Sequence, residues 1–318
     1  MFLIDSYIRD RLVRKVRAKK EKIARLGTPY TENPKVSAVV TSYNHRANIK
    51  PILEAYRAAD LEELIVCEDG SLDGSRDEWL KHLLRPNDFL IVSNELNELR
   101  IYNRAISLAR GEIVIVNQDD DIPPQDASWI RDAVRLFDKY PRLAILGALE
   151  GAQQPIFTLD NYYRVKSLAE RLGQAKFRIP RKEIQHRDPE LGVGFMFIDV
   201  VNNGPLIFRR QAYLELGGLD TSRSKAGESM MFMDYDLCYR AWLAGWQVGL
   251  YEHAPFVTNA GQRASVLFAH GDRKKRGKET REYLNQAYSH VYEDVGSRAR
   301  RLNEEFLTLA DHKETVNS

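Results

Sequence analysis

Residues 35 to 121 alternate between two hydrophobic patterns. Short runs of Val, Ile and Leu that end in polar residues are separated by stretches whose apolar residues recur at helical spacing. The strand patterns are KVSAVVTSYN (35–44), ELIVCEDGS (63–71), DFLIVSN (88–94) and EIVIVN (112–117), and the helical patterns lie at about 47–59, from about Asp73 onward, and at 100–109. Strands that alternate with helices pair in parallel, because each crossover returns the chain to the same end of the sheet. We therefore expect an α/β fold with a doubly wound, mostly parallel central sheet and helices on both faces.

Polar loops follow three of these strand patterns. They are TSYN (41–44), EDGSLDGS (68–75) and NQDDD (117–121). Ligands of parallel sheets bind beyond the carboxyl ends of the strands, so we expect the three loops to meet at one site. Asp119, Asp120 and Asp121 repel one another, and a fold tolerates such a cluster when a cation shares it. A solvated acidic turn is the simpler alternative, but two acidic loops beside a Thr/Tyr loop favour a site for a polar ligand and a metal ion.

Composition excludes several classes of protein. The chain has 318 residues, 43% of them hydrophobic, which allows a sizeable core in one large or two modest domains. The net charge of +2 does not indicate nucleic-acid binding. Cys67 and Cys238 have neither metal-ligand nor disulfide spacing, so we expect a cytoplasmic protein. No apolar run approaches the ~20 residues that span a bilayer, and the initial MFLI is too short for a signal peptide, so we expect neither secretion by that route nor a membrane span.

Residues 2–26 form a basic amphipathic pattern. The apolar residues at helical spacing are Ile4, Ile8, Leu12, Val16 and Ile23, and the basic residues around them are Arg9, Arg11, Arg14, Lys15, Arg17, Lys19, Lys20, Lys22 and Arg25. Such a helix can lie on an anionic membrane surface as a peripheral anchor. It can equally dock on the protein's own core or on a second subunit of a homo-oligomer. The sequence leaves these alternatives open.

Five segments together resemble the family 2 glycosyltransferases. They are VSAVVTSYNHRANIKPIL, LIVCEDGSLDGS, NRAISLARGEIVIVNQDDD, NGPLIFRRQAYLELGGLD and MDYDLCYRAWLAGW, which follow the family's order and approximate spacing over about residues 35–257. The resemblance implies the GT-A fold and an inverting, metal-dependent transfer that uses Mn²⁺ or Mg²⁺. It implies a nucleotide-diphosphate sugar as donor, typically a UDP-sugar. The implied acceptor is a hydroxyl of a saccharide or lipid-linked glycan in cell-surface polysaccharide synthesis.

The resemblance also assigns donor-binding residues. Thr41 and Tyr43 match the loop that lies against the nucleotide base, where a hydroxyl can hydrogen-bond and a ring can stack. Asp69 matches the carboxylate that accepts a hydrogen bond from a base ring nitrogen, and Asp119 matches the residue next to the ribose. Ordinary strand-end and strand-to-helix turns remain the alternative for these segments.

The metal ligands implied by the resemblance follow Gln118. This residue stands where the family usually has the first aspartate of its metal motif. Asp120 then holds the metal ion on the donor diphosphate, and Asp121 is an alternative ligand if the register differs by one residue. His270, in the segment FAHGD, is the candidate for a late histidine ligand, although a lone histidine is more often structural.

The acceptor side is implied by the last two segments. Gly217, Gly218 and Asp220 match a loop that borders the acceptor pocket, where glycines let a sugar approach the backbone; a plain turn is the alternative. Asp234 matches the general base, which takes the proton of the attacking hydroxyl. A carboxylate stabilised by a helix N-terminus is its alternative. We expect Asp236 and Arg240 to have structural roles.

These assignments divide the chain into four parts. Residues 1–34 are a basic helix and linker, 35–150 a nucleotide-sugar-binding half, 151–260 an acceptor-binding and catalytic half, and 261–318 a mobile loop and an appended helical tail. Within the third part, residues 152–200 are rich in Tyr and basic residues, which fits sugar stacking, binding of lipid-carrier phosphates or an exposed helix. A nucleotidyltransferase and a catalytically silent sugar-binding relative are the alternative functions.

Overall fold

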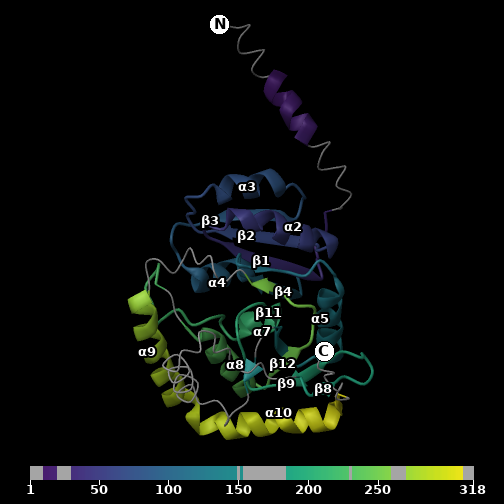
Figure 1. The fold of residues 1–318 in the computed structure, drawn as a ribbon, viewed down its shortest axis with the longest axis vertical. Helices are drawn as coiled ribbons and strands as arrows, with labels where there is room; N and C mark the ends of the chain where they lie inside the picture. Colours follow the sequence, from purple (N-terminus) through teal and green to yellow (C-terminus); the bar gives the residue numbers. More distant parts are fainter. Residues whose placement is uncertain are drawn as a thin grey trace, which may run out of the picture.

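The fold is built around one mixed sheet. The computed structural model describes residues 10–19, 30–148, 151–152, 184–228, 231–258 and 270–310, with side chains except at 151–152, 258 and 270–274. Eight strands form the sheet in the order β3-β2-β1-β4-β11-β6-β12-β9 (Figure 1). Their bounds are β1 Val36–Ser42, β2 Glu63–Glu68, β3 Asp88–Val92, β4 Ile113–Asn117, β6 Leu143–Gly147, β9 Phe195–Phe197, β11 Leu206–Arg209 and β12 Gln247–Tyr251.

Most neighbouring strands run in parallel, which confirms the prediction. The parallel pairs are β1 with β2 and β4, β2 with β3, and β6 with β12. β11 lies antiparallel between β4 and β6, and β9 pairs antiparallel with β12 at one edge. All residues of β2 and β4 are buried, whereas β3 at the opposite edge is half-exposed. Such complete burial requires cover on both faces of the sheet.

Eight named helices accompany the sheet in the described part of the chain. They are α2 Ile49–Ala58, α3 Ser75–His82, α4 Glu98–Leu108, α5 Ser128–Lys139, α7 Arg210–Glu215, α8 Met233–Leu243, α9 His270–Tyr288 and α10 Tyr292–Phe306. The three helices predicted between residues 47 and 109 correspond to α2, α3 and α4. In α2 the buried side chains recur at helical spacing, at Ile49, Ile52, Leu53 and Tyr56, because this stripe packs onto the sheet.

Short elements complete the fold. Two-stranded pairs join β5 (Asp121–Ile122) to β13 (Val257–Thr258), β7 (Gly151–Ala152) to β10 (Val200–Val201), and β8 (His186–Arg187) to β14 (Thr308–Leu309). The 3-10 turns are Arg46–Asn48 and Ser289–Val291.

The C-terminal helices are part of the core, so the expectation of an appended tail is wrong for the described residues from 275 onward. Leu284, Val295 and Ala299 are buried without exposure. The buried carboxylate of Asp236 on α8 accepts hydrogen bonds from the hydroxyls of Tyr283 and Tyr288 on α9. The sequence of α9 and α10 is mostly polar, because their contacts with the core depend on a few apolar and tyrosine side chains.

Helix α10 also closes an open edge of the sheet. It lies along β9, the last strand (Figure 1). The side-chain oxygen of Asn303 accepts a hydrogen bond from the Phe197 amide at 2.7 Å, and its Nδ2 donates to the Phe197 carbonyl at 3.0 Å. One amide side chain thus pairs the two backbone groups that a further strand would pair.

Residues 10–19 form a helix that is exposed throughout. Leu12, Val13 and Val16 are among the exposed large apolar side chains. Within the described residues, docking of this helix on the protein's own core is therefore not observed. None of the helices in the described ranges is long and apolar enough to span a bilayer.

We expect Asn303→Ala to destabilise the protein by about 2 to 4 kcal/mol, because it leaves two buried backbone groups of Phe197 without partners. Chemical denaturation measures the change. Glu304→Ala, at the next and exposed position of α10, is the matched control and should change stability by less than about 0.5 kcal/mol. Equal stability of the two variants would show that Asn303 does not close the edge.

Candidate active site

The candidate site lies where the order of the strands reverses. β2 and β3 lie on one side of β1, and β4 lies on the other, so the loops after β1 and β4 diverge at their carboxyl ends. β11 runs antiparallel to β4, with Leu206 opposite Val116, so the segment before β11 arrives at this same end. Residues from both halves of the chain therefore meet beyond β1 and β4.

Asp119 ties the loops after β1 and β4 together. Its Oδ2 accepts the Tyr43 amide at 2.5 Å, and its Oδ1 lies 2.9 Å from Nδ1 of His45. The Asn48 side chain donates to the Asp119 carbonyl at 2.8 Å. Burial raises the pKa of Asp119, the bond to His45 opposes this rise, and the neighbouring charge of Asp120 adds to it. Both carboxylate oxygens thus brace the loop predicted to contact the base.

His45 was not among the site residues predicted from the sequence. It is buried in the loop directly after β1, close to the predicted donor-binding residues. Its position beyond a strand end was the only available signal, and this signal does not separate a buried histidine from a solvated one.

Asp120 differs from its neighbours in having no hydrogen-bond or ion-pair partner among the described residues, and its side chain is half-buried. No group of three His, Cys, Asp or Glu side chains able to hold a metal ion occurs in those ranges. A hard divalent ion is often held by one or two carboxylates together with substrate phosphates and water. The carboxylate of Asp120, which has no partner among the described residues, fits this kind of site.

Asp121, the alternative ligand, lies in a different environment. It is 4% exposed and belongs to β5, where it pairs with Thr258 of β13. Burial, with a further contribution from the Asp121 charge, raises the pKa of the Tyr56 hydroxyl on α2. Asp121 is therefore packed against α2, while Asp120 is more exposed. The side chain of His270 lies outside the described residues.

The carboxylate of Asp69 binds the loop between β3 and α4. Its carboxylate accepts the Ser93 hydroxyl at 2.7 Å and the amides of Leu96 and Asn97 at 2.8 and 2.9 Å. These bonds hold the loop that leads into α4. The Oγ1 atom of Thr41, at the end of β1, lies 3.5 Å from the hydroxyl oxygen of Tyr102 on α4. The structure brings Thr41, Tyr43, Asp69 and Asp119 to the same end of the sheet, as the sequence predicts.

Asp234 lies in the first turn of α8. Its Oδ2 accepts the Asn203 amide at 2.7 Å, and its Oδ1 accepts the Tyr235 amide at 3.0 Å. Burial raises the pKa of Asp234 to about 6, and the charge of Glu98 contributes to the rise. Phe232, just before the helix, has the left-handed φ of 62°, a strained conformation for this residue. The side chain is thus held in place and has the proton affinity of a useful general base.

Glu98 was also missed from the sequence. Its Oε1 accepts hydrogen bonds from the Tyr102 hydroxyl at 2.8 Å, from the Asn203 side chain at 3.0 Å and from Nε2 of Gln118. The predicted site included only the loops after β1, β2 and β4. The acidic residues of SNELNE, which follows β3, were the available signal for Glu98.

The predicted acceptor loop ends helix α7. Gly217 and Gly218 have left-handed φ values of 77° and 71°, and the Gly218 amide donates to the Tyr213 carbonyl at 2.9 Å. A Cβ on Gly218 would lie 2.6 Å from Oδ1 of Asn103, whereas the space beside Gly217 is open. Asp220 accepts the Ser222 amide at 2.8 Å. Helix termination accounts for both glycines, and only Gly217 has room for a ligand.

Arg240 holds this loop in place. It forms an ion pair with the buried Asp236 at 2.7 Å and donates to the carbonyls of Leu216 and Gly218. Asp236 and Arg240 therefore have the structural roles expected of them.

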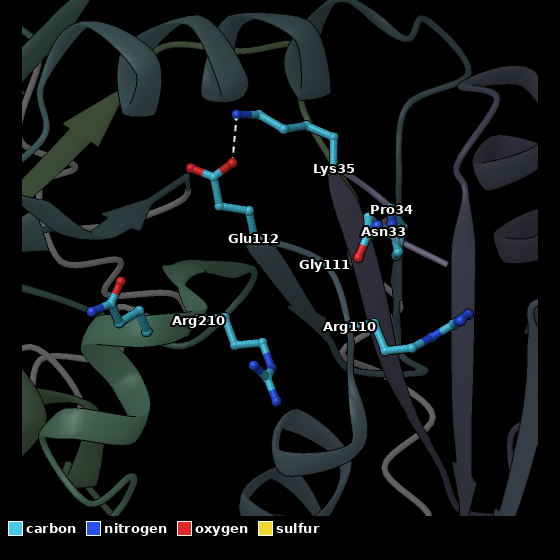
Figure 2. A pocket seen from close by; sticks show the side chains of 8 residues that line it. Asn33, Pro34, Lys35, Arg110, Gly111, Glu112 and Arg210 are labelled. Atoms are coloured by element: carbon cyan, nitrogen blue, oxygen red, sulfur yellow. Dashed lines mark hydrogen bonds and ion pairs between the residues drawn. The ribbon is translucent and has the colours of Figure 1, made fainter. Parts of the chain in front are cut away.

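A separate cleft of about 320 Å³ opens at the amino ends of β1 and β4, away from these loops (Figure 2). The Lys35 ammonium donates hydrogen bonds to the carboxylates of Glu112 and Asp138. The Arg110 guanidinium donates to Glu63, and that of Arg210 donates to backbone carbonyls of α4. Its charged side chains already have protein partners, so the cleft offers little to a charged ligand.

Comparison with known proteins decides the family. The sequence model described as Glycosyl transferase family 2 matches residues 37–199, a little over half of the 318 residues. The chain belongs to glycosyltransferase family 2. The mostly parallel sheet with its antiparallel β11 and β9 is this family's GT-A fold. No curated protein matches the chain.

Solved structures similar to this family 2 member have low sequence identity. TarS of S. aureus in complex with UDP-GlcNAc is 15% identical with a TM-score of 0.47, and the match covers 69% of this chain and 58% of that one. The mannosyltransferase PcManGT from Pyrobaculum calidifontis, in complex with GDP-Man and Mn²⁺, is 15% identical with a TM-score of 0.47, covering 92% and 85%. The chain thus spans less than two thirds of the S. aureus protein.

We expect Asp234→Asn to stabilise the protein at pH 8, and the gain to shrink as the pH falls to 5. The folded state holds this proton more tightly, because burial raises the pKa from 3.8 to about 6. Between these two values the folded state binds more protons than the unfolded chain, so wild-type stability falls as the pH rises through this window and stays reduced above it. Asn carries no charge and avoids this loss, which is on the order of 1 to 3 kcal/mol.

Denaturation at a series of pH values measures this difference. Asp77→Asn, which removes an exposed carboxylate from α3, is the control and should show no such trend. A gain for Asp234→Asn that does not depend on pH would contradict the raised pKa.

Proposed function

We propose that this protein is an inverting glycosyltransferase that moves a sugar from a nucleotide-diphosphate sugar to an acceptor hydroxyl. The observation that carries the proposal is the environment of Asp234, a half-buried carboxylate with a pKa raised to about 6 at the start of α8. Family membership supports it, as does the carboxylate of Asp120, which has no partner in the part of the chain that the structure describes.

Asp234 acts as the general base. Its carboxylate takes the proton of the acceptor hydroxyl while the hydroxyl oxygen attacks the anomeric carbon. The bond from this carbon to the diphosphate oxygen breaks on the opposite face, so the configuration inverts. A pKa near 6 leaves the group ionised at neutral pH yet more basic than an ordinary aspartate. The two amides that bind its oxygens fix the direction from which it meets the acceptor.

Asp120 would hold a divalent ion, Mn²⁺ or Mg²⁺, beside the donor diphosphate. A bound divalent ion stabilises the negative charge that develops on the departing diphosphate. Asp121, being buried against α2, is the weaker candidate for a ligand, and His270 remains a proposed third ligand.

The donor lies across the loops after β1, β2 and β4. Thr41 and Tyr43 contact the base, and Asp119 contacts the ribose while bracing the Tyr43 loop. Asp69 accepts a bond from the base, typically uracil of a UDP-sugar. Three of its roughly four acceptor positions are used by the β3 to α4 loop, which leaves about one for the ligand.

The acceptor is a saccharide or a lipid-linked glycan of cell-surface polysaccharide synthesis. Gly217 and Asp220 border it, since the space beside Gly217 is open. Gly218 contributes through the turn that it allows, because its other side is filled by Asn103.

A panel of nucleotide sugars with Mn²⁺ tests the function. We expect release of a nucleoside diphosphate from one donor; pyrophosphate would indicate a nucleotidyltransferase, and no release with intact binding a silent sugar-binding protein. Asp120→Asn should reduce turnover at least about a hundredfold and weaken Mn²⁺-dependent donor affinity in calorimetry, because the metal loses its carboxylate.

Asp234→Asn completes the test. It should bind the donor normally but lose transfer, because the base is absent and the donor contacts are not. Asp77→Asn, in the exposed first turn of α3, controls for loss of a carboxylate. Unchanged metal-dependent affinity in folded Asp120→Asn, or normal transfer by Asp234→Asn, would refute the respective assignment.

We also propose that the N-terminal helix binds an anionic membrane surface and holds this cytoplasmic enzyme near a lipid-linked acceptor. Leu12, Val13 and Val16 are 58%, 43% and 54% exposed on the helix at residues 10–19. The basic residues of this helix are Arg11, Arg14, Lys15, Arg17 and Lys19. An apolar stripe can enter the lipid interface while each basic side chain near anionic headgroups contributes about 1 kcal/mol.

We expect the full chain to sediment with vesicles that contain phosphatidylglycerol, and less so as salt rises. Deletion of residues 1–26 should abolish this without lowering thermal stability, and neutral phosphatidylcholine vesicles are the control. A deletion variant that still binds, or that unfolds, would refute the membrane contact. Sedimentation equilibrium identifies the remaining alternative, in which the same deletion dissociates a homo-oligomer.

A further inference from the structure

Glu98 gathers hydrogen bonds from three separate parts of the fold. Its single oxygen Oε1 accepts from Tyr102 on α4, from Gln118 in the loop after β4, and from Asn203 in the segment between β10 and β11. The first is a neighbour one helical turn away, but the other two lie far along the chain. Glu98 thus joins the first half of the sheet to the second.

Two of these partners lead directly to the reacting groups of the proposed function. Gln118 immediately precedes Asp119 and Asp120 in the donor loop. Asn203 binds Glu98 through its side chain and binds Asp234 through its backbone amide, at 3.0 and 2.7 Å. A continuous path of hydrogen bonds therefore runs from the donor loop through Glu98 to the general base.

The position of Glu98 is itself tightly determined. It is the first residue of α4, where a carboxylate is favoured by the helix N-terminus. The preceding Asn97 has a left-handed φ of 74°, and its amide is held by Asp69 at 2.9 Å. The backbone at the start of α4 is thus fixed by the same carboxylate that faces the donor base.

The charge of Glu98 also acts on Asp234. Two carboxylates near one another are unfavourable when both are ionised. The Glu98 charge accordingly contributes to the raised pKa of Asp234.

We propose that Glu98 is a positioning residue: through Gln118 and Asn203 it holds the donor loop and the general base in one arrangement, with its charge facing that base. This inference rests on the proposed function in naming Asp234 as the base, whereas the coupling between the two carboxylates is a property of the fold. It predicts that removing the charge makes Asp234 a weaker base.

The other titratable groups that the structure describes near Asp234 are either neutral or paired with an opposite charge. Removing the Glu98 charge is therefore the change that tests its effect on Asp234. Among the described residues, α8 contributes Cys238, whose thiol pKa is raised by burial, and Asp236, which is paired with Arg240. The Cys238 thiol stays neutral at ordinary pH, and the Asp236 charge is balanced by its partner. From α4, Glu98 presents a carboxylate whose charge contributes to the raised pKa of Asp234.

The test compares Glu98→Gln, which removes the charge and keeps the shape, with Glu98→Ala, which also removes the acceptor. Glu95→Gln, an exposed change of equal charge in the loop just before α4, is the matched control. The titration of Asp234 is followed by NMR in protein with ¹³C-labelled aspartate carboxyls, with the signal assigned from Asp234→Asn. The pH dependence of kcat with the active donor is measured beside it.

We expect the Asp234 titration to move down by about half a unit to one unit in Glu98→Gln and not in Glu95→Gln, since a nearby negative charge is lost. The acid limb of kcat should move with it. Glu98→Ala should also lower kcat about tenfold or more with a smaller change in donor KM, because Asn203 loses its anchor. Such changes distinguish positioning from a structural role, which would lower thermal stability and leave the titration unchanged.

An unchanged Asp234 titration in folded Glu98→Gln would overturn the inference, whatever the activity. Because NMR needs no turnover, the two proposals fail separately. A shifted titration in a protein that is silent toward every donor would sustain the coupling and refute the proposed function. Normal transfer by the wild type, together with an unshifted Asp234 titration in Glu98→Gln, would sustain the proposed function and refute the coupling.

Discussion

The parallel pairing of β1 with both β2 and β4 determines how the remaining strands and helices are arranged. Because β1 is bonded on both sides and buried nearly throughout, helices must cover both faces, and each crossover must return to the same end of the sheet. The order of the strands reverses at this point, so the loops after β1 and β4 diverge, which is where parallel sheets bind their ligands. Asp119 then fixes the loop after β1, since its two oxygens hold the backbone and the histidine of that loop.

The antiparallel insertion of β11 makes the site a joint product of both halves. A strand that runs opposite to β4 begins where β4 ends, so the residues before it reach the loops of the first half. Asn203 comes to lie between Glu98 and Asp234 for this reason. Two half-buried carboxylates are then held on either side of Asn203, and the ionised form of Asp234 becomes less favourable. The fold accepts this loss of stability at neutral pH, which is a common sign of a functional group.

The C-terminal helices cover the open edge of the sheet and contact helix α8. α10 covers the edge strand β9 through Asn303, and α9 contacts α8 through tyrosine hydroxyls that donate to Asp236. Asp236 also orients Arg240, which holds the end of α7. Helix α8, the end of α7 and the C-terminal helices are therefore connected by hydrogen bonds.

The parallel sheet, the approximate limits of its first four strands and the place of the polar loops at their carboxyl ends could be predicted from the sequence. They depend on local periodicity, which can be read within a window of a few residues. Long-range packing sets the state of each carboxylate: Asp119 is bound to His45, Asp120 has no partner among the described residues, Asp121 is buried against α2, and Glu98 is shared among three elements. The same holds for the polar helices α9 and α10, whose contacts involve few side chains. Burial and pairing join residues that are more than about a hundred positions apart, and no local pattern records which of them will meet.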